Sequence, residues 1–218
     1  PSALAMKLAN FASLDPTITS TGRRGLVGAS TLDKEIWKEF HSNWEGLAIE
    51  CEQLRQRLLI EHGLENEDAC EVDNESMIVN YFGETRQVIV QQRIKQGFFR
   101  RAVLAGYRES CCISGVGDPR FLVASHIVPW REDKANRLNP SNGICLSTIH
   151  DKAFDIYLFS LTDDYRVILS KQLELTKDKF LQGIFWSVQG RKINLPDRFV
   201  PEPSFLKRHR DKMLGINT

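Results

Sequence analysis

Two short apolar runs near the middle of the chain, separated by a polar loop, do most to limit how it can fold. The runs are "FLVASHIV" at 121–128 and "GICLS" at 143–147, and both have the length and β-branched content of strands. Pro129 ends the first run, because proline has no N–H for a sheet hydrogen bond. Ser147 ends the second and can cap a helix that continues to about Tyr157. The order strand, loop, strand, helix predicts a hairpin packed against a helix.

The sequence before these runs has a helical pattern. Apolar residues recur every three or four positions over residues 32–58, which predicts one long amphipathic helix. Ser30 and Asp33 have the spacing of a capping box at its start, and Gly63 provides a stop signal. The apolar stripe suits packing within its own domain and also a seam with a second copy. A homodimer through the 32–58 helix is therefore one of two expectations.

The remaining chain mixes helices and short strands. Residues 85–107 predict a second helix, and "CCISGV" at 111–116 has the composition of a strand. The runs at 157–161 and 165–170, separated by "TDD", predict a hairpin, and a basic helix is expected at 203–214. These elements predict the α+β class, with an N-terminal helical region and flanking helices around the central hairpin and helix.

An acidic stretch marks a boundary between two parts of the chain. Residues 61–75 carry seven acids and no Lys or Arg, which is the composition of a solvated linker. We expect one part at 1–75, made of an N-terminal arm, the long helix and the acidic linker. The second part, at 76–218, holds the central hairpin and its flanking basic helices.

Composition and charge exclude several classes of protein. No apolar run approaches the roughly 20 residues of a membrane helix, and no secretory signal opens the sequence, which predicts a cytoplasmic protein. Five cysteines, an odd number, give no disulfide framework in a chain of this length, so we expect reduced thiols. The net charge is only +1, but residues 86–108 hold six basic residues and no acid. Such segregation can produce a phosphate-binding face.

Two histidines and an asparagine occupy the ends of the predicted elements. His126 ends the first strand, Asn142 precedes the second, and His150 lies in the first turn of the helix. An imidazole with a pKa of about 6.5 can accept a proton from water at neutral pH, and another can hold a divalent ion against a phosphate oxygen. Asn142 also fits a plain Asn-Gly turn. One base and one metal ion suffice for phosphodiester hydrolysis.

The motifs "LVASHIVPW", "NRLNPSNGICLS" and "HDKAFD", in this order and spacing, resemble the HNH endonucleases, and the resemblance covers roughly residues 96–161. It implies a ββα-metal nuclease core in which His126 is the general base and His150 is a metal ligand. Asn142 would fix the loop that orients the base. The resemblance also implies that the bound ion stabilises the leaving 3′ oxygen, which yields 5′-phosphate and 3′-hydroxyl ends.

The metal site departs from the family pattern at two positions. Many relatives have Asp or His where this chain has Ser125, and the colicin-type nucleases have a second helical His where it has Phe154. Ser125 and Asp155, the nearest acid along the helix, are the remaining candidate ligands beside His150. A site completed by water suits Mg²⁺ or Mn²⁺, with Zn²⁺ as the alternative.

The expected function is metal-dependent cleavage of DNA, in restriction or a related bacterial defence. Arg137 in the loop is a candidate phosphate clamp, and Arg100 and Arg101 are candidates for contacts with the DNA backbone. The alternative for Arg137 is an ion pair with Glu132 or Asp133, and the alternative for Arg100 and Arg101 is a solvated surface. The two departures at the metal site fit a second hypothesis, a DNA-binding module that has lost catalysis. The apolar 32–58 stripe fits a third, a protein-interaction subunit of a defence complex.

Overall fold

The computed structural model describes residues 2–20, 22–63 and 83–216. Its backbone contacts divide the chain into two compact units, Pro1–Val79 and Asn80–Thr218, and each is described by itself. The predicted domain boundary between residues 75 and 76 lies outside the described residues. None of the helices in the described ranges combines the length and apolar character that a membrane crossing requires.

The first unit is helical. Its helices are α1 (Ala3–Leu14), α2 (Pro16–Thr19), α3 (Thr31–Phe40) and α4 (Trp44–His62). The buried carboxylate of Asp33 joins α3 to α1, because it accepts hydrogen bonds from Lys7 Nζ at 2.7 Å and Asn10 Nδ2 at 3.1 Å. The bond from Lys7 is the main reason why the pKa of Asp33 lies well below its usual range. The predicted arm thus contains α1, which the sequence analysis did not anticipate.

The prediction of one long helix over 32–58 is wrong, because the chain breaks between α3 and α4. The side chain of Asn43 accepts a hydrogen bond from Gly46 N at 3.0 Å and so caps a new helix. The capping box of Ser30 and Asp33 is confirmed, and so is the stop at Gly63, which has a φ of 62°. A seam between two copies through these helices remains a prediction.

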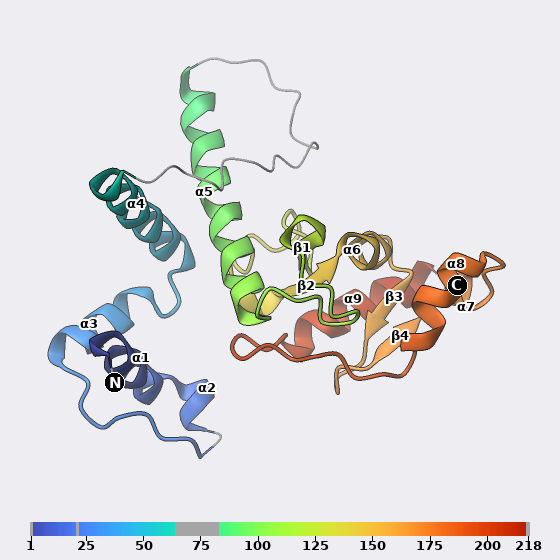
Figure 1. Cartoon of the computed structure of the whole chain (residues 1–218), viewed down its shortest axis with the longest axis horizontal. Coiled ribbons are helices and arrows are strands. Elements are labelled where there is room, and N and C mark those ends of the chain that lie inside the picture. Colours follow the sequence, from blue (N-terminus) through green and yellow to red (C-terminus); the bar gives the residue numbers. More distant parts are fainter. Residues whose placement is uncertain (1, 21, 64–82, 217–218) are drawn as a thin grey trace. The chain divides into compact units, whose positions relative to one another are not determined.

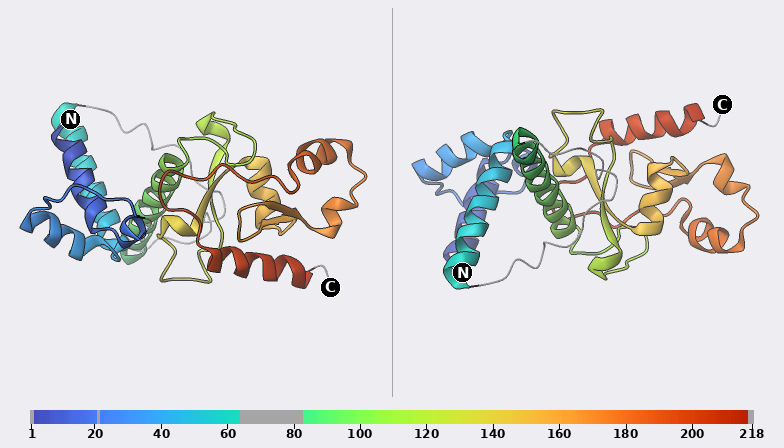
Figure 2. Two further views of the ribbon diagram at one scale, coloured as in Figure 1. Left: turned by 90° about the horizontal axis from the view of Figure 1, so that it is seen from below. Right: turned by 90° about the horizontal axis from the view of Figure 1, so that it is seen from above.

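The second unit confirms the predicted α+β class, with a small ββα region over residues 122–155. Its first elements are α5 (Gly83–Gly106), η3 (Pro119–Phe121), β1 (Leu122–His126), η4 (Pro140–Asn142), β2 (Gly143–Ser147) and α6 (Thr148–Asp155). β1 and β2 pair antiparallel, in a register that runs from Leu122 opposite Ser147 to His126 opposite Gly143. The β1–β2 hairpin lies between α5 and α6 (Figure 1), as the turned views in Figure 2 also show. The predicted strands and the helices on either side of them are confirmed.

The C-terminal part of the second unit completes its core. It contains β3 (Phe159–Leu161), β4 (Val167–Leu169), α7 (Lys171–Glu174), α8 (Lys179–Phe185), η5 (Trp186–Val188) and α9 (Pro203–Ile216). β3 and β4 form the predicted antiparallel hairpin, and α9, the predicted basic helix, packs against β3. Phe154 and Leu206, from α6 and α9, are fully buried.

Residues 111–116 form a turn, so the predicted strand there is wrong. Cys111 N donates to Val116 O at 2.8 Å, and Gly115 N donates back to Cys111 O at 2.9 Å. Gly115 has a φ of 74°, which closes the turn in a conformation that glycine adopts without strain. The apolar composition of this segment reflects its burial, since Cys111 and Cys112 both lie in the core.

Gly143 allows α5 to approach the hairpin closely. A Cβ at this position would lie 2.5 Å from Val103 Cγ2 and 2.7 Å from Phe99 Cζ. Both of those side chains are only 2% exposed, so neither can move aside without disturbing the core. The glycine of the Asn-Gly pair is therefore required by packing, whatever the turn itself needs.

We expect Gly143→Ala to lower the free energy of unfolding by about 2 kcal/mol or more, because overpacking a tight contact costs on the order of 1–3 kcal/mol. The matched control is Gly183→Ala in α8, where a Cβ would meet nothing within 4 Å. That change should stabilise by about 0.5–1 kcal/mol, since glycine disfavours a helix interior. Urea unfolding of both variants measures the difference, and equal stabilities would contradict the close approach of α5.

Candidate functional site

His126 is held in a defined orientation at the end of β1. Its ring stacks on Phe99 of α5, with centroids 3.8 Å apart and planes 9° apart, and meets the edge of Trp130 at 5.6 Å. Nε2 lies 2.9 Å from the carbonyl oxygen of Arg137. A carbonyl only accepts hydrogen bonds, so Nε2 carries the proton and Nδ1 carries the lone pair. The basic nitrogen of His126 is therefore Nδ1.

Burial favours the neutral form of this imidazole. Desolvation lowers the pKa of His126 from its ordinary value of 6.5, and the hydrogen bond to the Arg137 carbonyl opposes this only in part. His126 is consequently neutral at pH 7 and can accept a proton.

The buried side chain of Asn142 holds the segment that follows His126. Its Oδ1 accepts from Val128 N at 2.8 Å, and its Nδ2 donates to Val128 O at 3.1 Å and Asn136 O at 3.4 Å. Its backbone carbonyl accepts from Ile127 N at 2.9 Å. These bonds close the loop between β1 and β2 on both sides, which is what a residue that orients a neighbouring base must do.

Arg137 contributes to the loop through its backbone and its side chain. Its carbonyl binds His126, while its guanidinium carbon lies 5.1 Å from the ring centroid of Trp130. The Nε atom of Arg137 is buried and has no hydrogen-bond partner among the described residues. The predicted phosphate clamp is thus a half-buried arginine stacked over an aromatic ring.

His150 is the buried residue of the first turn of α6. Its Nδ1 lies 2.7 Å from Ser147 Oγ and 4.0 Å from Cys111 Sγ. The ring meets the edge of Phe185, with centroids 5.4 Å apart. Ser147 occupies the predicted N-cap position but makes no capping hydrogen bond, because its hydroxyl faces His150 instead. The Nε2 atom of His150 is buried and, within the described part of the chain, has no hydrogen-bond partner.

Sequence reasoning missed Ser147 and Cys111 as neighbours of His150. Burial raises the pKa of Cys111, but hydrogen bonds from His150 and from Ser114 outweigh this and hold it at about 6. Burial raises the pKa of Cys145 to about 12. The proximity of Ser147 to His150 could have been predicted from the sequence. Ser147 lies three residues before His150 at the start of a helix, and residues with this spacing share one helix face.

The two other predicted ligands occupy different surroundings. Ser125 is 3% exposed, and its Oγ has no partner among the described residues. Because strand side chains alternate and His126 faces α5, Ser125 faces the α6 side of the hairpin. Asp155 is exposed at the end of α6, and five residues of helix place it about 140° around the axis from His150.

A divalent ion would find few protein donors at this site. In the described ranges, no group of three or more His, Cys, Asp and Glu side chains is placed to hold a metal ion. Four buried side-chain polar atoms of the described residues lack hydrogen-bond partners, and two of them are His150 Nε2 and Ser125 Oγ. An imidazole nitrogen and a hydroxyl oxygen are each possible ligands of a divalent ion.

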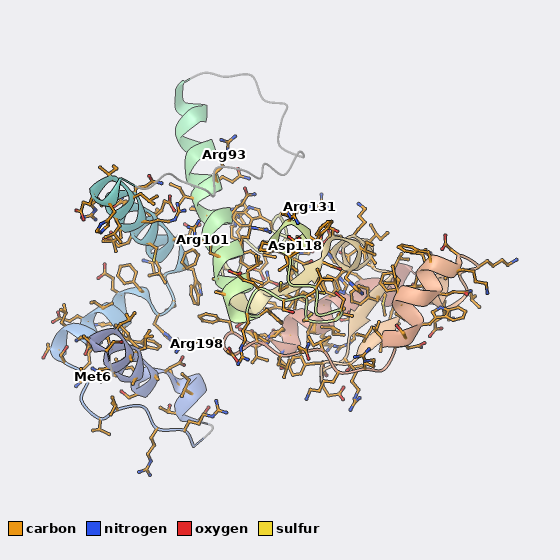
Figure 3. The ribbon with its side chains drawn as sticks, viewed as in Figure 1. Met6, Arg93, Arg101, Asp118, Arg131 and Arg198 are labelled. Atoms are coloured by element: carbon orange, nitrogen blue, oxygen red, sulfur yellow. The ribbon has the colours of Figure 1, made fainter. Side chains whose placement is uncertain are left out.

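The arginines that we predicted to contact nucleic acid differ in their surroundings within the protein. Arg100 donates to Leu122 O at 2.9 Å and Pro119 O at 3.4 Å, so it joins α5 to the start of β1. Arg101, labelled on α5 in Figure 3, is half-buried. The described contacts bring His126 together with Arg137, whereas the neighbours of His150 are Ser147, Cys111 and Phe185.

His209 of α9, to which the sequence analysis assigned no role, is part of the core beside this site. Its Nδ1 lies 2.9 Å from Ser160 Oγ and its Nε2 lies 3.1 Å from Phe154 O. Its ring stacks on Phe154 at 3.7 Å. Burial is the main reason why the pKa of His209 is lowered to about 4.

Comparison with known proteins identifies the segment that carries this geometry. Residues 111–162 match the family described as HNH endonuclease, so the chain contains an HNH endonuclease domain there. No curated protein matches the chain. It is similar to a solved structure of the modification-dependent TagI restriction endonuclease at 18% identity and a TM-score of 0.40. The aligned region covers 52% of this chain and 36% of that one.

The buried His209 should make folding sensitive to acid. The unfolded chain binds a proton on this histidine near pH 6.5 and the folded chain only near pH 4, so stability is lost as the pH falls through this interval. The full effect is roughly 3 kcal/mol, at about 1.4 kcal/mol per pKa unit.

We expect His209→Gln to be less stable than wild type at pH 7, with a difference that shrinks between pH 6.5 and pH 4.5. Urea unfolding followed by circular dichroism measures it. His62→Gln, which removes an exposed histidine at the end of α4, controls for the loss of a histidine outside the core. A stability difference that is independent of pH would contradict the lowered pKa.

Proposed function

We propose that this chain, whose residues 111–162 form an HNH endonuclease domain, is a metal-dependent endonuclease that hydrolyses DNA phosphodiester bonds. The observation that supports this most is the state of His126, a neutral imidazole whose Nε2 is committed to the Arg137 carbonyl. Its Nδ1 is then available to accept the proton of an attacking water. A role in restriction or a related defence is part of the same proposal.

The residues around His126 act by fixing its position. Asn142 keeps the loop closed, so that the Arg137 carbonyl stays 2.9 Å from Nε2 and the ring cannot rotate. Phe99 limits the ring from the α5 side. A base held in one orientation loses little entropy when the water and the phosphate bind.

The metal ion would be held by His150 Nε2, with Ser125 Oγ as a weak second donor. A bound ion stabilises the negative charge that develops on the leaving 3′ oxygen, so that 5′-phosphate and 3′-hydroxyl ends result. Donors this few favour Mg²⁺ or Mn²⁺, which keep water ligands, over the closed tetrahedral cage typical of Zn²⁺. Asp155, exposed at the end of α6, would contribute through a bound water.

DNA is the substrate that the basic side chains around the hairpin would attract. Arg137 and Arg101 are the candidates for phosphate contacts, while Arg100 would act through the position of the backbone that it binds.

One observation favours a second candidate function, a DNA-binding module without catalysis. The described residues contain no cluster of three metal-binding side chains.

We expect the purified chain to nick or cut plasmid DNA with Mg²⁺ or Mn²⁺ and not in EDTA. His126→Ala should slow cleavage by about two orders of magnitude or more, the usual effect of losing a general base. Gel-shift binding should persist, and His62→Ala, at an exposed position far along the sequence, should cut like wild type. Undiminished cleavage by His126→Ala would refute the assigned base, and binding without cleavage in every metal would favour the second candidate.

Asp155→Asn tests whether this carboxylate touches the ion. The side chain is exposed while His150 is buried, so we expect the Mn²⁺ concentration for half-maximal cleavage to stay within about twofold of wild type. The comparison is His150→Ala, which should weaken both turnover and metal dependence. Loss of activity in Asp155→Asn that added Mn²⁺ restores would instead make Asp155 a direct ligand.

A further inference from the structure

The loop between β1 and β2, residues 129–139, carries charges of both signs. Its cations are Arg131, Lys134 and Arg137, and its acids are Glu132 and Asp133. This loop lies beside the candidate base, since the Arg137 carbonyl is 2.9 Å from His126 Nε2. A phosphate that is attacked by a water bound to His126 must come close to this ring. The charges of the loop are therefore near the position that the scissile strand would occupy.

Both acids of the loop are paired with cations of α9. Asp133 accepts from Arg208 Nη1 at 2.7 Å, and Glu132 pairs with Lys212. The sequence offered these two acids as alternative partners of Arg137, but in the structure they bind α9 instead. The guanidinium of Arg137 lies over the ring of Trp130.

The cations of the loop, in contrast, keep their positive charge uncompensated. Arg131 and Lys134 are exposed, and no carboxylate of the described residues pairs with either of them. Arg137 has a buried Nε that lacks a hydrogen-bond partner within the described ranges. The loop has three cations against two acids, a net charge of +1, and the two cations of α9 raise this to +3.

The pairing with α9 changes how the loop would act on DNA. Two unpaired carboxylates would repel the phosphate backbone, because charges interact over roughly 8 Å at physiological ionic strength. A cation bound directly to each carboxylate cancels most of this repulsion. Exposed ion pairs add little to stability, so the larger effect of these two pairs is on the electrostatic field around the loop.

We propose that Arg131, Lys134 and Arg137 form a phosphate-binding surface on this loop. In the same proposal, α9 maintains the surface by neutralising Glu132 and Asp133. The inference rests on the proposed function, in which the chain binds DNA, and it adds two cations to the contacts proposed there. The paired cations of α9 promote DNA binding without touching DNA, because they act through the acids that they bind.

The first experiment measures the salt dependence of binding by the full chain, with a fluorescein-labelled DNA duplex in EDTA so that no strand is cut. Each phosphate contact that is lost lowers the slope of log affinity against log salt by about one. We expect Arg131→Gln/Lys134→Gln to lower the slope by about two and to bind about tenfold or more weakly. The matched control is Lys177→Gln/Lys179→Gln, at two exposed lysines around the start of α8, which should keep the wild-type slope. An unchanged slope in the loop variant, or an equal fall in the control, would overturn the inference.

The second experiment separates neutralisation by α9 from direct contact with DNA. Lys212→Gln leaves Glu132 unpaired, and we expect it to bind the duplex about three- to fivefold more weakly, the scale of one like-charge repulsion across roughly one Debye length. The Glu132 carboxylate binds only Lys212 among the described residues, so Lys212→Gln/Glu132→Gln removes both charges and should bind within about twofold of wild type. If Lys212 itself touched DNA, the double variant would stay as weak as Lys212→Gln, and the inference would be wrong.

Arg166→Gln is the matched control for the loss of one cation. It breaks an ion pair with Asp164 in the turn between β3 and β4, and it lowers the net charge of the chain by the same amount as Lys212→Gln. We expect its affinity to stay within about twofold of wild type. A loss equal to that of Lys212→Gln would mean that net charge alone sets the affinity, which would overturn the inference. Urea unfolding checks that each variant keeps its fold.

The failure of this inference and of the proposed function can be told apart. A wild-type chain that binds no DNA contradicts the proposed function, and the phosphate-binding surface falls with it. A wild-type chain that binds and cuts DNA, with an unchanged salt slope in Arg131→Gln/Lys134→Gln, contradicts the surface alone. Binding without cleavage, with the slope lowered in that variant, supports the surface and contradicts only the catalytic part of the proposed function.

Discussion

The buried amide of Asn142 is the interaction on which the rest of the site depends. Its oxygen accepts from the Val128 N–H and its nitrogen donates to the Asn136 carbonyl, so one side chain closes both ends of the loop between β1 and β2. That loop carries the Arg137 carbonyl, which selects the tautomer of His126. Without the amide, buried backbone groups would lose their partners, which is costly in a core. The geometry of the base therefore depends on a residue that need not touch substrate.

The helix α9 supports the same loop from outside through charge pairs. Arg208 binds Asp133 at 2.7 Å, and Asp133 in turn accepts from Asn136 N at 3.1 Å, while Lys212 pairs with Glu132. The basic helix α9 thus uses part of its positive charge for ion pairs within the protein. Exposed pairs of this kind each contribute little to stability. Their effect here is to connect the loop between β1 and β2 to the C-terminal helix.

The strands and helices of the second unit could be predicted because their signals are local. Two short apolar runs, a proline after the first and a serine before the helix predict β1, β2 and α6. The break at Asn43 could not be predicted from spacing, because the apolar period is the same on both sides of it. The turn at 111–116 looked like a strand since burial, not sheet pairing, selects its apolar residues. His126 and His150 could be named as candidate site residues because of their order along the chain. The hydrogen-bond partner of Ser147 could not be predicted in this way, because its hydroxyl can bond either the start of the helix or the neighbouring His150 ring.

The two histidines of the HNH segment are hydrogen-bonded to the protein through different ring nitrogens. His126 gives Nε2 to a carbonyl and retains a lone pair on Nδ1, on the α5 side of the hairpin. His150, in the first turn of α6, engages Nδ1 with Ser147, and its Nε2 has no hydrogen-bond partner within the described ranges. Proton transfer and metal binding each need an imidazole lone pair, so one ring cannot serve both at the same time. Here the two rings differ in the nitrogen that the protein engages, which is Nε2 in His126 and Nδ1 in His150. His126 ends a strand, and His150 lies in the first turn of the following helix. These two positions give identical side chains different hydrogen-bond partners and therefore different chemistry.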